Sequence, residues 1–348
     1  MTWFHSRWAR EQAVRLIAGL IAAGLAISGF VWAQPPRAEL SVLCSNNVES
    51  CLAVAQEFEL ETGTTVHTVR LPTSEALGRI RVAADQPEFD VWLGGPAESY
   101  VDAANEGLLV PIGDLPSVRQ LPESLRDTDG YWAGVYGGIL AFCVNTDLLA
   151  DADVPNSWED LLGPQFQGGI LMSSPLLSGT AATMLWVQYS RLGGTGEMVS
   201  YMRTLETNLQ GYLDSGTAVA RNVARGNASV GISFAPYCEA ERVNGAPVKL
   251  VYPEDGTGFE VGAVAVVAGT RNYEGARDFV SFAVSAQGQR VSASQVPQSY
   301  TTPDLSPNLI EEINSLVVPV LGGDVSVSAQ VRSHLITVWA TEVRRGTY

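Results

Sequence analysis

Short apolar strands and amphipathic helices alternate through the first part of the chain that follows an N-terminal apolar stretch. Residues 39–44, 65–70 and 90–93 have the pattern of strands, and a helical pattern follows each of them. The first and the last of these helical patterns stop at Gly63 and Gly107, as expected for glycine at a helix end. Such alternation predicts a parallel sheet covered by helices, which is the α/β class.

Two long extended runs interrupt this alternation, and we interpret them as crossings between two domains. Residues 130–145 are rich in glycine and aromatic residues, and residues 258–268 are mostly apolar. A chain of 348 residues is long enough for two domains, and two such crossings would form a hinge. We expect residues 329–344 to form a helix that packs on the first domain. The expected boundaries are 38–134 with 265–348 for domain I, and 135–264 for domain II.

The N-terminal segment has the features of an export signal. Residues 7–15 carry three arginines, residues 16–32 are apolar or small, and Val31-Trp32-Ala33 offers a small-residue cleavage site. We therefore predict a signal peptide over residues 1–33 and a mature protein in the periplasm. The alternative is an uncleaved N-terminal membrane anchor, because the apolar run is at the short end of a membrane span.

Four cysteines agree with an exported protein, because disulfides persist outside the cytoplasm. We favour the pair Cys44–Cys51, whose spacing closes a small loop, and this leaves Cys143 for Cys238. All three connectivities of four cysteines stay open from sequence. A metal site is the competing interpretation. The chain has no Cys-x-x-Cys spacing and only two histidines after the export signal, so we expect no metal and no cofactor.

Charge restricts the partners of the protein. The formal net charge is −16, which argues against binding to nucleic acid or to an anionic membrane surface. It does not exclude a small anionic ligand, since helix starts and single arginines act locally. Lys249 is the single lysine, so a fixed cationic contact would come almost entirely from arginine.

The four residues Ser-Gly-Thr-Ala occur twice, at 178–181 and at 215–218. Each copy stands where a helix is expected to begin, and serine is a good N-cap because its hydroxyl bonds a free amide of the first turn. A helix start carries a partial positive charge and unpaired N–H groups, which attract an anion. Either copy alone is most simply an ordinary helix cap, whereas the two together indicate a cleft for a small, negatively charged ligand.

Polar or small residues follow five of the predicted strands. In open α/β sheets, ligands bind beyond the carboxyl ends of the strands. We therefore expect these five segments to line one interdomain cleft. They are residues 45–47, 73–74, 94–95, 178–180 and 215–217.

The chain also contains a series of short motifs. Their order along the chain is more specific for a protein family than any one motif alone. They are Phe58-Glu59, Glu61-Thr62-Gly63, Asp90-Val91-Trp92, Gly94-Gly95, Glu106-Gly107-Leu108, the two Ser-Gly-Thr-Ala copies, Ala224-Arg225-Gly226, Gly231-Ile232-Ser233-Phe234, Gly256-Thr257-Gly258-Phe259-Glu260 and Gly262. In this order they resemble the extracytoplasmic substrate-binding proteins of ABC importers, in the ferric-iron and organophosphate branch of the type 2 periplasmic binding proteins. The resemblance covers nearly all of the chain after the export signal.

The resemblance implies a two-domain type 2 fold with two hinge crossings and a central cleft that closes around a small-molecule ligand. It also implies delivery of that ligand to an ABC permease in the inner membrane, with no enzymatic activity, and we expect a monomer. The ligand contacts that it implies are Ser45, Ser74, Ser178, Thr180, Ser215, Thr217 and Glu260.

Further candidate contacts lie beside these positions. Small or amide-bearing residues share the same segments, and aromatic side chains nearby would stack on a ligand or cover the cleft. They are Asn46, Gly95, Gly179, Gly216, Tyr136, Phe234, Tyr237 and Tyr300. Glu260 would accept hydrogen bonds from a sugar hydroxyl or pair with an amine.

Two departures from the relatives bear on the ligand. Sugar-phosphate-binding relatives carry His-Asp after the Gly-Ile-Ser-Phe strand, where this chain has Pro236 and Tyr237. Iron-binding relatives use neighbouring tyrosines, whereas Tyr300 follows Ser299. We therefore predict a small organic anion, such as a phosphorylated, phosphonate or carboxylate compound. The alternatives are ferric iron, alone or with a bridging anion, and a sensor subunit that presents its ligand to a membrane receptor kinase. The chain has no Gly-x-Ser-x-Gly nucleophile elbow and no phosphate-loop motif, so we do not predict an enzyme.

Overall fold

The computed structural model describes residues 39–321 and 323–344, so the predicted export signal lies outside the described residues. The strands are β1 (Glu39–Cys44), β2 (Thr65–Arg70), β3 (Val91–Pro96), β4 (Leu109–Val110), β5 (Ala133–Asn145), β6 (Ile170–Ser173), β7 (Leu209–Leu213), β8 (Val230–Phe234), β9 (Val248–Val251) and β10 (Phe259–Val267). The α-helices are α2 (Val48–Thr62), α3 (Thr73–Val82), α4 (Ala97–Asn105), α5 (Pro116–Arg119), α6 (Gly179–Leu192), α7 (Thr195–Glu206), α8 (Gly216–Ala224), α9 (Ala235–Val243), α10 (Tyr273–Val284), α11 (Ala286–Ala293), α12 (Leu309–Ser315) and α13 (Val325–Val338), and a π-helical turn, η5 (Trp339–Val343), continues α13. In this part of the chain, none of the helices has the length and apolar character needed to span a bilayer.

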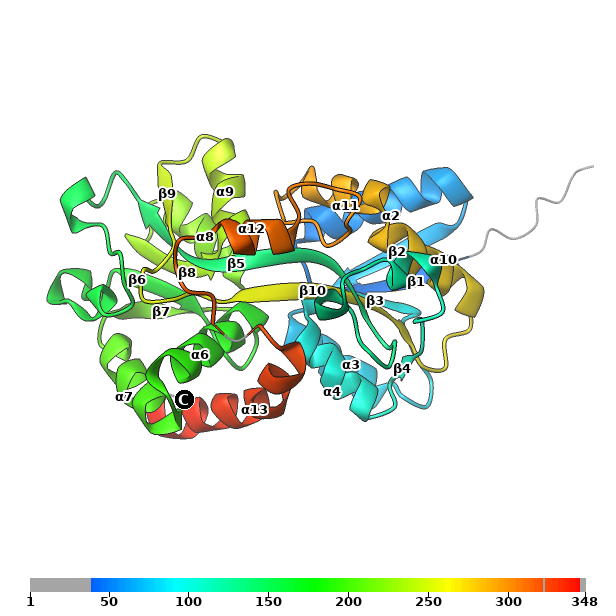
Figure 1. Cartoon of the computed structure of the whole chain (residues 1–348), viewed down its shortest axis with the longest axis horizontal. Coiled ribbons are helices and arrows are strands. Elements are labelled where there is room, and N and C mark those ends of the chain that lie inside the picture. The colour runs from blue at the N-terminus through cyan, green and yellow to red at the C-terminus, as the bar shows by residue number, and fades with distance from the viewer. Residues whose placement is uncertain (1–38, 322, 345–348) are drawn as a thin grey trace, which may run out of the picture. The chain divides into compact units, whose positions relative to one another are not determined.

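The strands form one ten-stranded sheet in the order β2-β1-β3-β10-β5-β8-β6-β7, with β4 beside β10 and β9 beside β5 (Figure 1). β1 pairs in parallel with β2 and β3, and β6 pairs in parallel with β7 and β8. The central strands β5 and β10 run antiparallel to their neighbours. The parallel strands predicted from the strand–helix alternation are therefore confirmed, and the antiparallel pairs arise where the chain crosses from one half of the sheet to the other.

β5 connects the two halves of the sheet. Its residues 133–139 lie along β10, and its residues 140–145 lie along β8 and β9. We call the half built on β1–β4 and β10 lobe I, and the half built on β6–β9 lobe II. Residues 130–145 thus form the expected crossing, and residues 258–268 form the adjacent strand β10.

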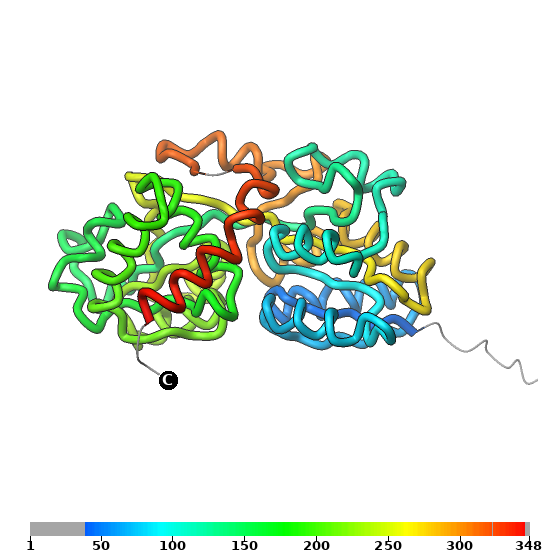
Figure 2. The backbone as a smooth tube through the Cα atoms, turned by 90° about the horizontal axis from the view of Figure 1, so that it is seen from below, coloured from blue at the N-terminus to red at the C-terminus, as the bar shows by residue number. Residues whose placement is uncertain are grey.

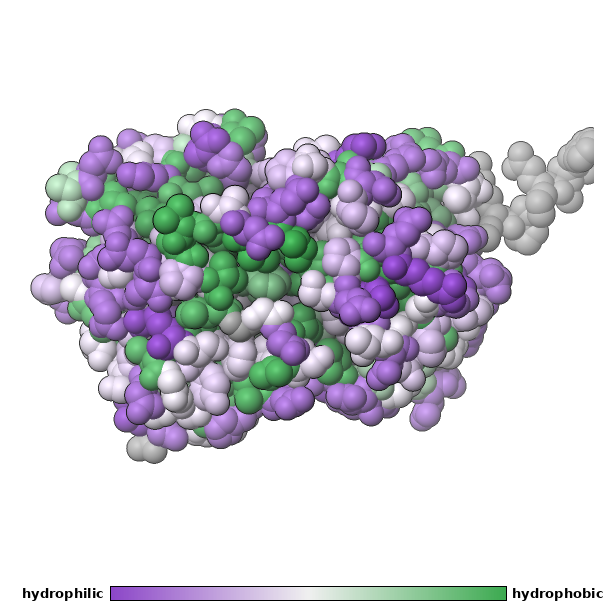
Figure 3. Space-filling view, viewed as in Figure 1, coloured by the Kyte–Doolittle hydropathy of each residue, from purple (hydrophilic) through white to green (hydrophobic). Residues whose placement is uncertain are grey.

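Each lobe has its own hydrophobic core. In lobe I, Trp92 of β3 stacks on Tyr100 of α4 with their ring centroids 4.0 Å apart, and both are fully buried. In lobe II, Phe142 of β5 meets Trp158 edge to face at 4.8 Å. Figure 3 shows hydrophobic residues gathered near the junction of the lobes on one face, with hydrophilic residues dominating toward both ends of that face.

The C-terminal helix differs from the sequence-based expectation. α13 contacts α4 of lobe I and α6 of lobe II, and η5 packs on α7 of lobe II (Figure 2). Leu335 and Trp339, which are 1% and 2% exposed, join the hydrophobic core of lobe II. The expectation that residues 329–344 pack on the first domain is therefore met only in part: α13 contacts α4 of lobe I, where Arg332 lies 4.0 Å from Asp102, but the segment also packs on lobe II. The buried face of α13 consists of Ser328, Ala329, Arg332 and Leu335, so it has no clear apolar stripe from which its partner could be predicted.

The disulfides join Cys44 to Cys51 and Cys143 to Cys238, so the favoured pairing is confirmed. The first bond links the end of β1 to the first turn of α2, and the second links β5 to α9. The sequence analysis did not predict α9. This helix follows β8 without a loop and has Pro236 in its first turn, a position where a missing N–H costs nothing.

Candidate functional site

A small cavity of about 30 Å³ lies among the polar segments that follow the strands, with walls from both lobes. Lobe I contributes Ser45, Asn46, Arg70, Pro72, Thr73, Gly95, Pro96 and Tyr136. Lobe II contributes Leu177, Ser178, Gly179, Thr180, Asp214, Ser215, Gly216, Thr217 and Tyr237, and Glu260 enters from the start of β10. The five segments predicted to converge on one cleft therefore each supply part of its wall.

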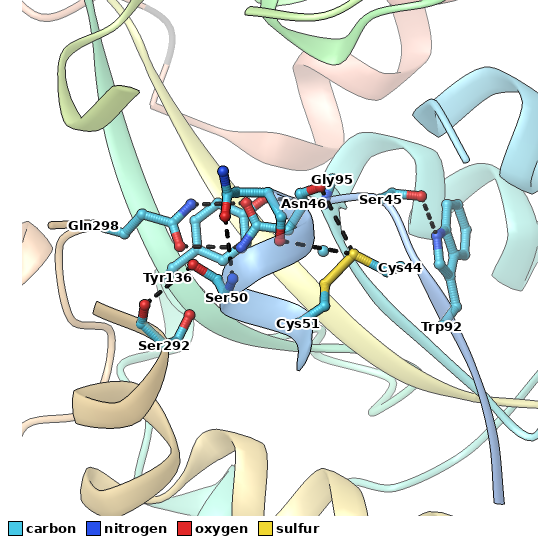
Figure 4. The surroundings of a disulfide bond; sticks show 12 residues. Cys44, Ser45, Asn46, Ser50, Cys51, Trp92, Gly95, Tyr136, Ser292 and Gln298 are labelled. Carbon is cyan, nitrogen blue, oxygen red and sulfur yellow. Dashed lines mark hydrogen bonds between the residues drawn. A yellow bond between two sulfur atoms is a disulfide. The ribbon is translucent and has the colours of Figure 1, made fainter. Parts of the chain in front are cut away.

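Hydrogen bonds fix the lobe I wall. Ser45 follows β1, and its hydroxyl oxygen accepts a bond from the Trp92 indole N–H at 2.9 Å (Figure 4). Asn46 is buried and exchanges two amide hydrogen bonds with Gln298, at 3.0 and 2.9 Å. Both side chains are thus held in place before any ligand arrives, which lowers the entropic cost of binding.

Gly95 brings the backbone of β3 close to the cavity. Its φ of +85° is accessible mainly to glycine, and a Cβ here would lie 2.9 Å from the Thr73 hydroxyl oxygen. The Gly95 N–H donates to the hydroxyl oxygen of Tyr136 at 2.9 Å. Thr73 itself is 4% exposed and begins α3. The glycine therefore allows β3, α3 and β5 to meet at one wall.

The two Ser-Gly-Thr-Ala segments behave differently in the structure. Ser215 caps α8, because its hydroxyl oxygen accepts a bond from the Ala218 N–H at 3.2 Å. Ser178 precedes α6 and is 5% exposed, but its side chain makes no capping bond to that helix. The Ser178 hydroxyl thus lines the cavity without serving its own helix. The expectation that both serines act as side-chain caps is therefore right for α8 and wrong for α6.

Small residues allow the lobe II wall to approach its neighbours closely. A Cβ on Gly179 would lie 2.2 Å from Cγ of Pro96 in lobe I, and one on Gly216 would lie 2.5 Å from the Thr180 hydroxyl oxygen. Real carbon atoms meet at 3.5–4.0 Å, so neither position accepts a side chain without movement. The first-turn amides of α6 and α8 have no acceptor within their own helices, and both helix starts face the same small cavity.

Glu260, Tyr237 and Tyr136 form a buried polar cluster at the cavity. Glu260 is 4% exposed, and burial raises its pKa well above the usual value, with the nearby Glu98 carboxylate adding to the rise and a hydrogen bond from Tyr237 opposing it. Burial likewise raises the pKa of Tyr237, whose hydroxyl also shares hydrogen bonds with Tyr136 and Gln298. Burial therefore shifts Glu260 toward its neutral, protonated form relative to an exposed glutamate.

Arg70 is a cavity residue that the sequence analysis missed. It ends β2, lines the cavity and is partly exposed. Its guanidinium forms neither a hydrogen bond nor an ion pair with any residue that the structure describes, and the other charged residue at the rim, Asp214, bonds the Ser215 hydroxyl at 3.0 Å. The signal for Arg70 was present in the sequence, because it closes a predicted strand at the same sheet edge as Ser45.

Three predicted contacts do not line the cavity. Phe234 is 1% exposed and packs in the lobe II core, because its side chain falls on the core-facing side of β8. Tyr300 lies in an isolated bridge to Asn308, and Ser74 instead donates its backbone N–H to the carbonyl of Leu177 across the lobes, at 3.4 Å. Residues that line the cavity outside the predicted segments are Arg70, Pro72, Pro96, Leu177 and Asp214, whereas Thr73 lines it from the predicted segment 73–74.

Metal-binding potential is limited in the part of the chain that the structure describes. There, no three His, Cys, Asp or Glu residues lie close enough to hold one ion. The oxygen donors at the cavity are hydroxyls, the Asp214 carboxylate and the buried Glu260. The cavity therefore presents hydrogen-bond donors and one free guanidinium, which is a donor set for an anion.

Comparisons with known proteins agree with this geometry. The sequence profile of the bacterial extracellular solute-binding proteins matches residues 94–319. An uncharacterized protein of Haemophilus influenzae is 32% identical over 337 residues, which cover 93% of this chain and 95% of that protein. The periplasmic binding protein AfuA from Actinobacillus pleuropneumoniae, solved with fructose-6-phosphate bound, is 30% identical with a TM-score of 0.82, covering 89% of this chain and 99% of AfuA.

Iron-binding proteins share the fold at lower identity. Iron-bound HitA from Pseudomonas aeruginosa superposes with a TM-score of 0.72 at 18% identity, covering 86% of this chain and 99% of HitA. This likeness supports the two-lobed architecture alone. The matched profile and the Haemophilus relative show the family: the chain belongs to the bacterial extracellular solute-binding proteins, which are the ligand-capturing components of ABC importers and not enzymes.

Proposed function

We propose that the protein captures a small organic anion, such as a phosphorylated, phosphonate or carboxylate compound, in the cavity between its lobes. The observation that carries the proposal is Arg70, a guanidinium without a partner among the described residues, at a cavity that two helix starts also face. A cation left without a counter-charge beside two positive helix ends favours a ligand that brings the negative charge.

The cavity supplies the contacts that such a ligand needs. The amides at the starts of α6 and α8 and the hydroxyls of Ser178, Thr180 and Thr217 donate hydrogen bonds, and Arg70 adds a charged pair. Hydrogen bonds to a charged group contribute roughly 1.5–3 kcal/mol each. A few of them together with Arg70 are sufficient for micromolar binding, which corresponds to about −8 kcal/mol.

Glu260 does not oppose an anion in this site. Its carboxylate form would repel the ligand, but burial favours the neutral acid, which donates a hydrogen bond through its O–H. The neutral acid and the Tyr237 hydroxyl then contact the uncharged, polar part of the ligand. AfuA, which was solved with fructose-6-phosphate, is consistent with a ligand that has both a charged group and hydroxyls.

We further propose that the two lobes are domains that close on the ligand and that the protein acts as a periplasmic monomer. Two contacts bridge the lobes near the cavity: an ion pair between Glu49 of α2 and Arg221 of α8 at 3.0 Å, and the Ser74–Leu177 backbone bond. The relatives include proteins described as periplasmic, which supports export by the predicted signal peptide and delivery to a permease of the inner membrane.

Thermal shift and calorimetry on the mature protein test the proposal. The panel contains phosphate esters, phosphonates, di- and tricarboxylates, polyamines and ferric citrate, because a ligand that binds the folded state alone raises the Tm. We expect organic anions to raise the Tm, and we expect Arg70→Gln to weaken the best of them about 10- to 150-fold.

The matched control is Arg271→Gln, which removes the same charge from an exposed loop and should bind like the wild type. Two results would contradict the anion proposal: a Tm shift with ferric iron alone, or an affinity for the best anion that Arg70→Gln leaves unchanged.

A further inference from the structure

A wider groove of about 380 Å³ adjoins the cavity at its outer side. Arg70, Asn46, Asp214, Ser215 and Thr217 line both spaces, so the two are continuous. The groove continues outward between α2 of lobe I and α8 of lobe II, and its remaining wall consists of Asn47, Val48, Ala218, Arg221, Asn222 and Arg225.

Three arginines meet in this groove on a protein with a net charge of −16. Arg70 and Arg225 form no side-chain ion pair with any described residue. Arg221 is already engaged, with Glu49 at 3.0 Å and with Glu241 at 3.8 Å. Asp214 is the one acidic residue in the groove wall. The groove therefore has more positive than negative charge, and the surplus lies on Arg70 and Arg225.

The sizes of the two spaces differ by an order of magnitude. The inner cavity has a volume of about 30 Å³. A single water molecule needs about 10–15 Å³, so the cavity has room for roughly two groups of that size. A compact head group fits there, but the rest of an organic ligand does not. With the head group at the starts of α6 and α8, the body of the ligand extends past Arg70 into the groove.

From this continuity and charge we propose that the natural ligand carries two anionic groups, one held at the helix starts and Arg70, and the second held in the groove by Arg225 with Arg70. The proposal rests on the function proposed above and narrows its ligand class to compounds with two anionic groups, such as phosphorylated carboxylates or bisphosphates. Arg225 follows α8 directly and is exposed, so it contacts the distal group alone and takes no part in binding the head group.

Matched ligand pairs test the proposal by calorimetry at low salt, where charge interactions are least screened. One pair is glycerol 3-phosphate and 3-phosphoglycerate, and another is fructose 6-phosphate and fructose 1,6-bisphosphate. In each pair the second compound adds an anionic group to the same carbon chain. We expect the wild type to bind the member with two anionic groups about tenfold more tightly in at least one pair.

Arg225→Gln should reduce that preference about three- to fivefold, the scale of an exposed ion pair, and leave the affinity for the member with one anionic group unchanged. Arg271→Gln removes an exposed arginine elsewhere and should preserve the preference. Equal affinity for both members of each pair, or equal weakening of both by Arg225→Gln, overturns the assignment of a second anionic group while the anion site stands. Failure of every anion in the wider panel to bind the wild type overturns the proposed function itself.

Discussion

Closure of the lobes can be tested at a contact that a single methyl group would block. Gly179, at the start of α6 in lobe II, faces Pro96, at the end of β3 in lobe I. A Cβ on Gly179 would lie 2.2 Å from Cγ and 2.4 Å from Cδ of that proline. Both partners are rigid, since one is a ring and the other is backbone. The Gly179→Ala variant therefore cannot close fully, because its lobes must remain more than about 1 Å further apart than those of the wild type.

The magnitude follows from the cost of overpacking. An extra methyl group in a tight contact costs about 1–3 kcal/mol, which corresponds to an affinity loss of about 5- to 150-fold. The clash involves one lobe against the other, so opening relieves it. We therefore expect Gly179→Ala to weaken ligand binding strongly while the free energy of unfolding of the ligand-free protein stays within about 0.5 kcal/mol of the wild type.

Calorimetry gives the affinity, and small-angle X-ray scattering gives the change in the radius of gyration on adding ligand. The matched control is Gly196→Ala in α7, where the added Cβ has no heavy atom within 4 Å. This control should bind like the wild type and gain about 0.4–1 kcal/mol in stability. If Gly179→Ala binds with unchanged affinity and compacts as the wild type does, the closed contact between Gly179 and Pro96 is not part of the binding mechanism.

Two further variants test the buried groups. Burial, with a contribution from Glu98, raises the pKa of Glu260 above its usual 4.5, so the stabilising contribution of this group is complete below the pKa of the unfolded chain and is lost as the pH rises through the folded pKa. In thermal melts from pH 4 to 9, the Tm of Glu260→Gln should therefore rise relative to the Tm of the wild type as the pH rises. A Tm difference that stays constant with pH would contradict the raised pKa of Glu260. Trp339→Ala should cost about 3–5 kcal/mol in chemical denaturation, because it leaves a cavity where η5 packs on lobe II. Val317→Ala, at a fully exposed side chain, is its control, and a loss below about 1 kcal/mol for Trp339→Ala would show that the C-terminal helix is loosely docked.

Local patterns predicted the parts of the fold that local chemistry decides. The strand–helix alternation gave the parallel strands, and the extended run 130–145 gave the crossing strand β5. The polar segments after the strands met at one cavity because the ends of neighbouring parallel strands share a sheet edge. The pairing Cys44–Cys51 was accessible for a similar reason, since its loop is short.

The predictions that failed are of two kinds. Some concern contacts between residues far apart in sequence, and others depend on which side of a helix or strand a side chain lies. Thr73 lines the cavity and Ser74 does not. The two hydroxyl-bearing residues are adjacent in α3, so the direction that each side chain takes depends on how the helix is rotated about its axis. Phe234 was assigned to the site, but the alternation along β8 directs it to the core. The docking of α13 on α6 depends on the surface that lobe II presents, which no pattern within residues 325–338 describes.

The charge arrangement gives a physical reason why an anion would favour the closed form. Lobe I supplies Arg70, and lobe II supplies the positive starts of α6 and α8. Closing the lobes without a ligand brings these like charges toward one another, and the Arg221–Glu49 ion pair and Asp214 offset this only in part. An anion between the lobes converts the repulsion into two attractive contacts, so it interacts more favourably with the closed form than with the open one. That difference in interaction is what a ligand needs to shift a conformational equilibrium, and a neutral compound of the same shape would lack it.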